Sequence, residues 1–473
     1  MDVFHPPKPV LLIMKMSRFL IHHLAFSGVP ILARIPGFHR VVGWIRACQI
    51  RRFDFPKEEL ASLQESINRH TSGFLSPNHP EMMTDMMVDW AVGSRVSSKM
   101  AFWAARQFVN GPLRPFWIRH NLIANTKCTG PHNYSHESAL RGDGVMLHPE
   151  GGVWWTSDRV QPLFPGVATL SLRVAKELSR SNNPCERDRP VYIAPVVWKY
   201  RFHHDVSGGL HREMDYIEHR LKLSSTKGRT IGERFAAIQW NVLLRQESKY
   251  GLVCEQAGLS FFDRQERYLE SLLQTLEKRY AITRLNHGPL PAHIEDWERP
   301  MMRQKMRIGH LQKETDGLKS KDPRAHRQAQ QDINEAIRVL GFSMFLYNRP
   351  TLTQEHLAES LKRLRQDLLQ GDRFDFLRKW MPLPVGPRCV HVRACAPIRV
   401  DHFLDNAESD GQERVQDLLR RVRSSMQMRL DALNEEYAEQ MAKYSHPNSL
   451  FDASSGMAPP FRHKICSNAM DES

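Results

Sequence analysis

The first two hundred residues alternate between short apolar runs and segments with a helix-like pattern of apolar residues. The apolar runs lie at residues 73–76, 145–147 and 191–197, and the last is nearly unbroken, as in a strand buried on both faces. Apolar residues at helical spacing cover residues 56–70, 135–141 and 166–178. The pattern also predicts a helix over 99–109 and an extended segment at 116–118. This alternation predicts an α/β fold with a largely parallel sheet flanked by helices.

The pattern changes after about Tyr200. Residues 211–380 are rich in charged residues and leucine at helical spacing, notably at 261–280 and 354–369, with a polar connector expected at 313–327. An alternating stretch at 390–400 then predicts one more strand of the first sheet, followed by a helix over 411–443. The polar residues from 445 onward lack periodicity, which indicates disorder.

These shifts predict five segments along the chain. They are a basic and apolar N-terminal segment (1–50), an α/β core (51–205), a helical insertion or separate helical domain (206–385), a returning strand and helix (386–444) and a disordered tail (445–473). Residues 10–33 are apolar on balance but carry Lys15, Arg18 and two histidines. A membrane-spanning helix tolerates almost no charge, so we expect an amphipathic helix, either in the membrane interface or packed on the protein's own core.

Composition narrows the class of partner. The 473 residues carry a formal net charge of +14, which favours an anionic partner such as a phosphorylated substrate or an anionic membrane surface. No zinc finger, basic zipper or RNA-binding aromatic signature supports a nucleic acid. The seven cysteines are scattered, and no histidine spacing fits a metal site, so we expect a reducing cytoplasmic setting and no metal.

The first candidate chemistry lies directly after the apolar run 73–76. His79 follows that run, and Asp85 stands six positions later. A neutral histidine can take a proton from a hydroxyl group, and a nearby carboxylate can orient it. The other interpretation is a helix-capping histidine beside an unrelated surface carboxylate. Because the chain has no Gly-x-Ser-x-Gly sequence, a serine acyl-enzyme is not supported.

The second candidate follows the run at 145–147. There His148-Pro149-Glu150-Gly151-Gly152 reads as a tight turn, in which backbone N–H groups at Gly151 and Gly152 could hold an anionic oxygen and Glu150 could bind hydroxyl groups. An ordinary turn with a surface glutamate is the alternative.

In order and approximate spacing, these two motifs and the later Ile193-Ala194-Pro195-Val196 resemble the motifs of the glycerolipid acyltransferase family, typified by the enzymes that acylate 1-acylglycerol-3-phosphate. The resemblance covers roughly residues 60–200. It implies His79 as general base, Asp85 as its orienting carboxylate, Glu150 and Gly151 at the acceptor, and Pro195 on a strand beside the acyl pocket.

The chain departs from the family pattern at two points. Five residues rather than four separate His79 from Asp85, so the pair can meet only if the extra residue is absorbed near Pro80; Glu81 is the fallback carboxylate. The arginine that follows the family's Phe-Pro-Glu-Gly motif is missing. Arg119 is the candidate for the family's middle arginine motif, and Arg159 or Arg173 for the missing cation.

The resemblance therefore implies an O-acyltransferase of phospholipid biosynthesis. It would move a fatty acyl group from acyl-CoA or acyl-carrier protein to a lysophospholipid or related glycerolipid, without a further cofactor, as a cytoplasmic protein attached peripherally to the membrane. The alternative is a non-catalytic membrane- or lipid-binding scaffold derived from the same fold. The tryptophans Trp154 and Trp155 are expected at the membrane interface, beside the site or in the core.

Overall fold

The protein consists of two compact units. A computed structural model describes residues 4–20, 50–109, 111, 113–152, 158–223, 228–252, 258–285, 290, 294, 296–317, 322–368, 384–404 and 411–453. One unit comprises Met1–Arg201 with Met381–Glu436, and the other comprises Phe202–Trp380 with Tyr437–Ser473. The chain thus leaves the first unit after Arg201, returns to it at Met381 and passes into the second unit again after Glu436.

The first unit is built on an eight-stranded, mostly parallel sheet, as the alternation of apolar runs predicts. Seven strands follow the order β1-β8-β6-β2-β5-β3-β4, and β9 pairs antiparallel with β6. Their bounds are β1 Ile50–Asp54, β2 Ser72–Pro77, β3 Ala101–Ala105, β4 Leu122–Asn125, β5 Val145–Met146, β6 Val191–Phe202, β8 Arg388–Ala394 and β9 Ile398–Arg399. The predicted strand at 390–400 is therefore present, divided between β8 and β9.

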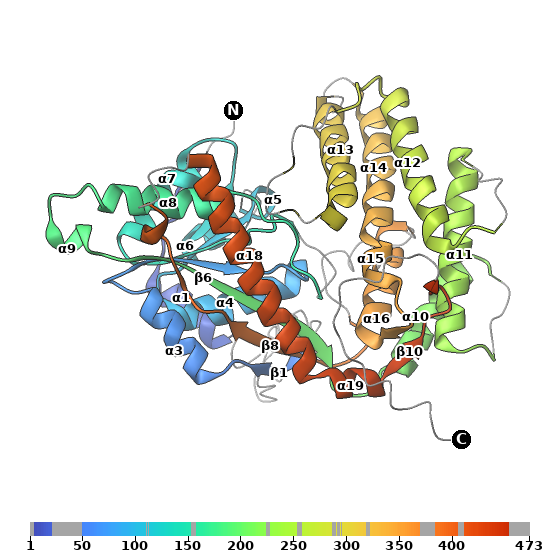
Figure 1. Cartoon of the computed structure of the whole chain (residues 1–473), viewed down its shortest axis with the longest axis horizontal. Coiled ribbons are helices and arrows are strands. Elements are labelled where there is room, and N and C mark those ends of the chain that lie inside the picture. The colour runs from blue at the N-terminus through green and yellow to red at the C-terminus, as the bar shows by residue number, and fades with distance from the viewer. Residues whose placement is uncertain are drawn as a thin grey trace. The chain divides into compact units, whose positions relative to one another are not determined.

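Helices cover both faces of this sheet. In Figure 1, α3 and α4 lie on one face and α7, α8 and α18 on the other. The helices of the unit are α1 Leu11–Leu20, α3 Lys57–Ser66, α4 Met82–Val96, α5 Arg106–Val109, α6 Arg114–Arg119, α7 Gly130–Leu140, α8 Gly166–Leu178, α9 Pro184–Arg187, η6 Asp401–Phe403 and α18 Gly411–Glu436. The buried apolar side chains of α3 and α4 form one core with those of β2, β6 and β8.

The described part of the second unit is mostly helical. It contains α10 Ser207–Arg220, α11 Ile231–Tyr250, α12 Phe261–Arg279, η3 Asp296–Glu298, α13 Arg299–Asp316, α14 Pro323–Gly341, α15 Met344–Tyr347, α16 Gln354–Arg363, η5 Leu364–Leu368 and α19 Ala438–Lys443, with the strand pair β7 Thr351–Thr353 and β10 Ser445–Pro447. Buried ion pairs such as Arg307–Glu277 hold neighbouring helices together. This unit accounts for the leucine-rich, charged region of the sequence.

Three predicted elements are wrong in whole or in part. Of the helix predicted over 99–109, residues 101–105 form the inner strand β3 instead, because both edges of this segment pair with β4 and β5, whereas Arg106–Val109 is helical as α5. Residues 116–118 are helical in α6, where Pro115 fits the first turn. Most of the described residues in the polar connector expected at 313–327 are helical, since α13 continues to Asp316 and Asp322 caps the start of α14.

The predicted segment boundaries also need correction near the C-terminus. The helix expected over 411–443 breaks at Tyr437, and α19 belongs to the helical unit. The tail expected to be disordered from Ser445 begins with β10, which pairs antiparallel with β7. Pairing of backbone groups with β7 orders this segment although it has no apolar period. Residues 454–473 lie outside the described part.

Among the described residues, no helix is both long and apolar enough to cross a membrane. Helix α1 covers the first part of the predicted amphipathic segment, and residues 21–49 lie outside the described ranges.

Candidate active site

The two candidate motifs meet because their strands are parallel neighbours. Phe74 and Leu75 of β2 pair with Val145 and Met146 of β5, so both strands end at the same edge of the sheet. Ligands of open α/β sheets bind beyond the carboxyl ends of the strands. His79 follows β2 at this edge and His148 follows β5, and the two imidazole rings stack with centroids 4.1 Å apart.

A loop absorbs the extra residue between His79 and Asp85. Pro80 stands before helix α4, which begins at Met82 after the extended cap residue Glu81. Asp85 lies in the first turn, and its Oδ2 is 2.7 Å from His79 Nδ1. The spacing of six positions therefore gives a hydrogen-bonded pair, because His79 is in the loop and not on the helix.

The Asp85 carboxylate accepts hydrogen bonds from three further groups. The Glu81 backbone N–H donates to Oδ2, and the Trp198 indole N–H donates to Oδ1 at 2.9 Å. The Tyr200 hydroxyl also donates to Oδ1. Burial raises the pKa of Asp85 to about 7, although these donors and the nearby His148 oppose the rise. Because Trp198 and the backbone can only donate, the arrangement is built for the ionised carboxylate.

His79 is a neutral histidine with access to the cavity. Burial, together with the charge of His148, holds its pKa well below the usual value. Its Nδ1–H donates to Asp85, so Nε2 carries the lone pair. The His79 side chain keeps 18% of its surface exposed, whereas the Asp85 side chain has none. His79 is thus the member of the pair that a substrate can reach.

Two buried side chains hold the His79 loop in place. The Asn78 amide donates to the Trp198 carbonyl and accepts from the Trp198 N–H, which ties the loop to β6. Glu150 accepts from the His79 backbone N–H through one oxygen and from the Gln161 N–H through the other, both at 2.8 Å. These bonds fix the backbone on both sides of the imidazole.

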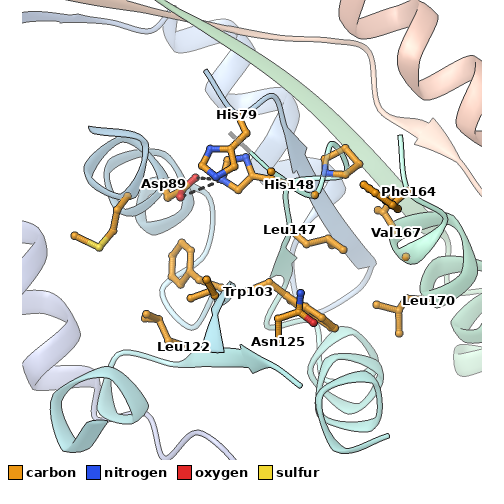
Figure 2. Close-up of a pocket in the computed structure, with 18 of the residues that line it drawn as sticks. His79, Asp89, Trp103, Leu122, Asn125, Leu147, His148, Phe164, Val167 and Leu170 are labelled. Atoms are coloured by element: carbon orange, nitrogen blue, oxygen red, sulfur yellow. Dashed lines mark hydrogen bonds and ion pairs between the residues drawn. The ribbon is translucent and has the colours of Figure 1, made fainter. Parts of the chain in front are cut away.

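Next to His79 lies a second histidine–carboxylate pair, His148 with Asp89. His148 Nε2 lies 3.1 and 3.2 Å from the two Asp89 oxygens, and Nδ1 lies 2.9 Å from the Asn78 carbonyl oxygen. Burial alone would lower the pKa of His148, but Asp89 raises it to about 9. Figure 2 shows both rings and Asp89 at one end of the cavity.

The cavity at this edge has a volume of about 600 Å³. Its wall is mostly apolar and aromatic, with Trp103, Leu122, Phe164, Val167 and Leu170 facing the two histidines in Figure 2. Among the described residues that line it, the titratable groups are His79, Asp89, His132 and His148, and none is a lysine or arginine. A long apolar group fits this lining, and a phosphate finds no lysine or arginine there.

Gly151 turns the chain at the mouth of the cavity. Its φ of +67° lies in the left-handed region, and a Cβ atom at this position would lie 2.5 Å from the Phe164 ring. Its N–H donates to the His148 carbonyl at 3.2 Å. Gly151 and Gly152 both line the cavity. Because the Gly151 N–H is bonded within the turn, it does not have the anion-binding position that the sequence predicted for it.

Other predicted site residues lie elsewhere. Arg119 is exposed at the end of α6 and Arg159 is half-buried, and the described cavity wall includes neither. Glu81, the fallback carboxylate, pairs with Arg388 at 2.8 Å and accepts from Thr84. Pro195 lies in β6 opposite Ser76 rather than on the wall.

Glu150 is also placed differently from the expectation. Its two oxygens bind backbone N–H groups, and it lies outside the cavity lining, so it supports the His79 loop where hydroxyl binding was expected. Residues 153–157, including Trp154 and Trp155, lie outside the described part.

Sequence reasoning missed three residues of the site, namely Asp89, which pairs with His148, and Trp198 and Tyr200, which donate to Asp85. Asp89 stands four positions after Asp85 and therefore on the same face of α4, which is a signal visible in the sequence. Trp198 and Tyr200 share one face of β6, but nothing in their spacing points to Asp85, more than a hundred positions away.

Comparison of the chain with models of protein families, with curated proteins and with solved structures finds no match.

Proposed function

We propose that this protein is an O-acyltransferase that moves a fatty acyl group from a thioester donor to the hydroxyl of a lysophospholipid or related glycerolipid. The observation that carries the proposal is the His79–Asp85 hydrogen bond at the end of an apolar cavity. The resemblance of the motifs around His79, Glu150 and Pro195 to those of glycerolipid acyltransferases supports the same reaction. The donor, acyl-CoA or acyl-carrier protein, is a substrate, and no cofactor is required.

In this reaction His79 Nε2 takes the proton from the acceptor hydroxyl as its oxygen attacks the thioester carbonyl. Asp85 holds the ring with Nε2 toward the cavity and stabilises the imidazolium that forms. The C–S bond of the tetrahedral intermediate then breaks, and the leaving thiolate takes the proton from His79. The products are an ester and a free thiol, and no protein nucleophile takes part.

The cavity lining supports a position for the acyl chain. Side chains such as Leu122, Val167 and Leu170 provide an apolar wall, which favours burial of methylene groups. Because the described lining carries no lysine or arginine, the phosphate groups of the donor and acceptor are placed outside it. Arg119 and Arg159 are proposed for such outer contacts only.

An exposed apolar face supports attachment to a membrane. The Lys8 and Val10 N–H groups donate to the carbonyls of Ile118 and Arg119, so the start of α1 and helix α6 form one surface. We call the exposed apolar side chains on it the α1–α6 face: Val10, Leu11, Leu12, Met16, Leu113 and Phe116.

Residues 4–20 and 106–128 contain no aspartate or glutamate, whereas Lys8, Lys15, Arg114 and Arg119 are exposed there. Exposed apolar side chains on segments that also carry exposed cations suit an anionic lipid surface, so we propose a peripheral protein at the cytoplasmic side of a membrane.

The second candidate is a non-catalytic lipid-binding scaffold. The same apolar cavity favours it, because a fatty chain can occupy this space without any reaction. It differs from the enzyme in needing neither His79 nor Asp85 for its ligand.

The decisive experiment is a mass-spectrometric screen of the lipids formed by the purified protein with mixed acyl thioesters and lysolipid acceptors. We expect new diacyl lipids with the native chain and their loss in His79→Ala, with His70→Ala, an exposed histidine of the same unit, as the matched control. Asp85→Asn should lower transfer by on the order of a hundredfold or more, and Glu81→Gln by much less. Full activity of His79→Ala would refute the proposal, and bound lipid without any product would favour the scaffold.

A further inference from the structure

The contacts of His148 determine its protonation state. Its Nδ1 faces the Asn78 backbone carbonyl, which can only accept a hydrogen bond. Its Nε2 faces the Asp89 carboxylate, which also accepts. Both ring nitrogens must therefore carry a proton, which makes His148 an imidazolium paired with the Asp89 anion. The pKa of His148, raised to about 9 by Asp89 against the effect of burial, agrees with this assignment.

This cation lies directly on the proposed base. The His148 and His79 rings stack with centroids 4.1 Å apart and planes inclined by 22°. A second positive charge on His79 at that distance is unfavourable, and a like charge within about 4–6 Å shifts a pKa by one unit or more. In the part of the chain that the structure describes, the other charged or titratable groups around the pair come from four elements. They are Asp85, Asp89 and Glu81 on α4 and its cap, Glu150 in the turn, Tyr200 on β6 and Arg388 on β8, which pairs with Glu81.

Both N–H groups of His148 are engaged by protein acceptors, although its ring lines the cavity. It therefore has no proton or lone pair to offer to a substrate in this arrangement. What it can do is set the charge state of its neighbours. Its positive charge opposes protonation of both Asp85 and His79 Nε2, and His79 acts as an oriented base only when Asp85 is ionised and Nε2 is free of a proton.

We propose that His148, held as a cation by Asp89, is a positioning residue that keeps His79 neutral under mildly acidic conditions and favours the ionised form of Asp85. The catalytic role of His148 rests on the proposed acyl transfer, whereas its effect on the charge states of His79 and Asp85 does not. The cation would also favour the later half of the reaction, because a strained imidazolium at His79 gives up its proton more readily to the leaving thiolate.

The first test needs no substrate. In protein labelled with ¹⁵N-histidine, nuclear magnetic resonance should show both His148 nitrogens protonated at pH 7.5 and His79 neutral down to well below pH 6.5. In His148→Phe, which keeps a flat ring without a charge, the midpoint of the His79 titration should rise by about one unit or more. Adding Asp89→Asn should reverse part of that rise, since the Asp89 anion favours protonated His79. A neutral His148 at pH 7.5, or an unmoved His79 midpoint, overturns the inference.

The second test follows kcat/KM for transfer of a palmitoyl group from its CoA thioester to a lysophospholipid between pH 5 and 9. His148→Phe should move the acidic limb to higher pH, and His132→Phe, which removes a cavity histidine from α7, should leave the limb in place. Equal shifts in both variants contradict the inference. If the resonance shifts occur but the native chain forms no product with any donor, the acyltransferase proposal fails while the electrostatic inference stands.

Discussion

At the scale of single residues, Asp85 is the group on which the site depends. Four donors surround its two oxygens, namely His79, the Glu81 backbone, Trp198 and Tyr200. Burial nevertheless raises its pKa to about 7, because a fully enclosed carboxylate loses its hydration. The four donors favour the ionised form of Asp85 and burial favours its neutral form, so both forms are populated near pH 7.

This balance predicts the pH dependence of transfer. The pKa of Asp85 in the folded protein, about 7, lies above the ordinary value of 3.8, so the carboxyl group gains its proton as the pH falls through 7. The protonated group no longer stabilises an imidazolium at His79, and His79 itself titrates well below 6.5. On the acidic side of the pH profile we expect kcat/KM to fall about tenfold for each pH unit. The midpoint of this decline reports the ionisation of the coupled His79–Asp85 pair. A flat profile from pH 5 to 8 would contradict this assignment.

At the scale of elements, helix α4 carries the chemistry. Asp85 and Asp89 stand four positions apart on it and bind the two stacked histidines that follow β2 and β5. The helix lies close against the sheet because Gly93 has no side chain: a Cβ atom there would lie 2.7 Å from the Phe102 ring and 3.0 Å from the Met146 methyl group. The position of α4 relative to β3 and β5 therefore depends on this glycine.

We expect Gly93→Ala to displace α4 and weaken transfer. Overpacking of a buried contact costs about 1–3 kcal/mol, or a few degrees in Tm for a unit of this size. The displacement would also move Asp85 away from His79, so kcat should fall by more than the change in stability explains. Thermal unfolding and initial rates measure the two effects. Gly309→Ala is the matched control, because a Cβ atom on that helical glycine would meet no atom beyond its own stretch of helix within 4 Å and alanine there favours the helix. Equal rates in the two variants would show that the contact of Gly93 does not position the site.

The elements also show what a sequence can reveal of such a fold. Helix α8 and strands β2 and β6 were predictable, because their apolar periods record burial on one face or on both. Strand β3 and helix α6 were not, since residues 101–105 become a strand by pairing with two neighbours and a six-residue helix has too few positions to show a period. Of the site, the His79–Asp85 pair was predicted. The donors on β6 were missed, because contacts between distant segments leave no spacing to read, and the His148–Asp89 pair was missed although Asp89 stands four positions after Asp85.

At the scale of the whole molecule, charge is the property that links the site to its surroundings. The described cavity wall has neither lysine nor arginine, so it contains none of the side chains that give the chain its net charge of +14. Part of it lies around the α1–α6 face, next to apolar side chains as exposed as Leu12 at 68% and Leu113 at 60%. Trp90 and Trp117, which line the cavity, both contact Phe116 of that face. The same aromatic cluster thus reaches from the cavity to the exposed surface, so a lipid held at this face would lie near the site.

This arrangement predicts binding to anionic membranes through the α1–α6 face. Co-sedimentation should show more protein on vesicles that contain phosphatidylserine than on pure phosphatidylcholine, with the excess lost as salt rises, because each cation near such a surface contributes about 1 kcal/mol that salt screens. Leu12→Asp and Leu113→Asp should each weaken binding on the order of tenfold, since a leucine buried in lipid contributes about 1.5 kcal/mol or more and 1.4 kcal/mol corresponds to a factor of ten. Leu244→Asp, at an exposed leucine of α11 in the helical unit, provides the matched control. If the control weakens binding as much as the two variants, the face is not the contact. If the variants bind normally but lose transfer, their effect lies in the cavity beside them and not at the membrane.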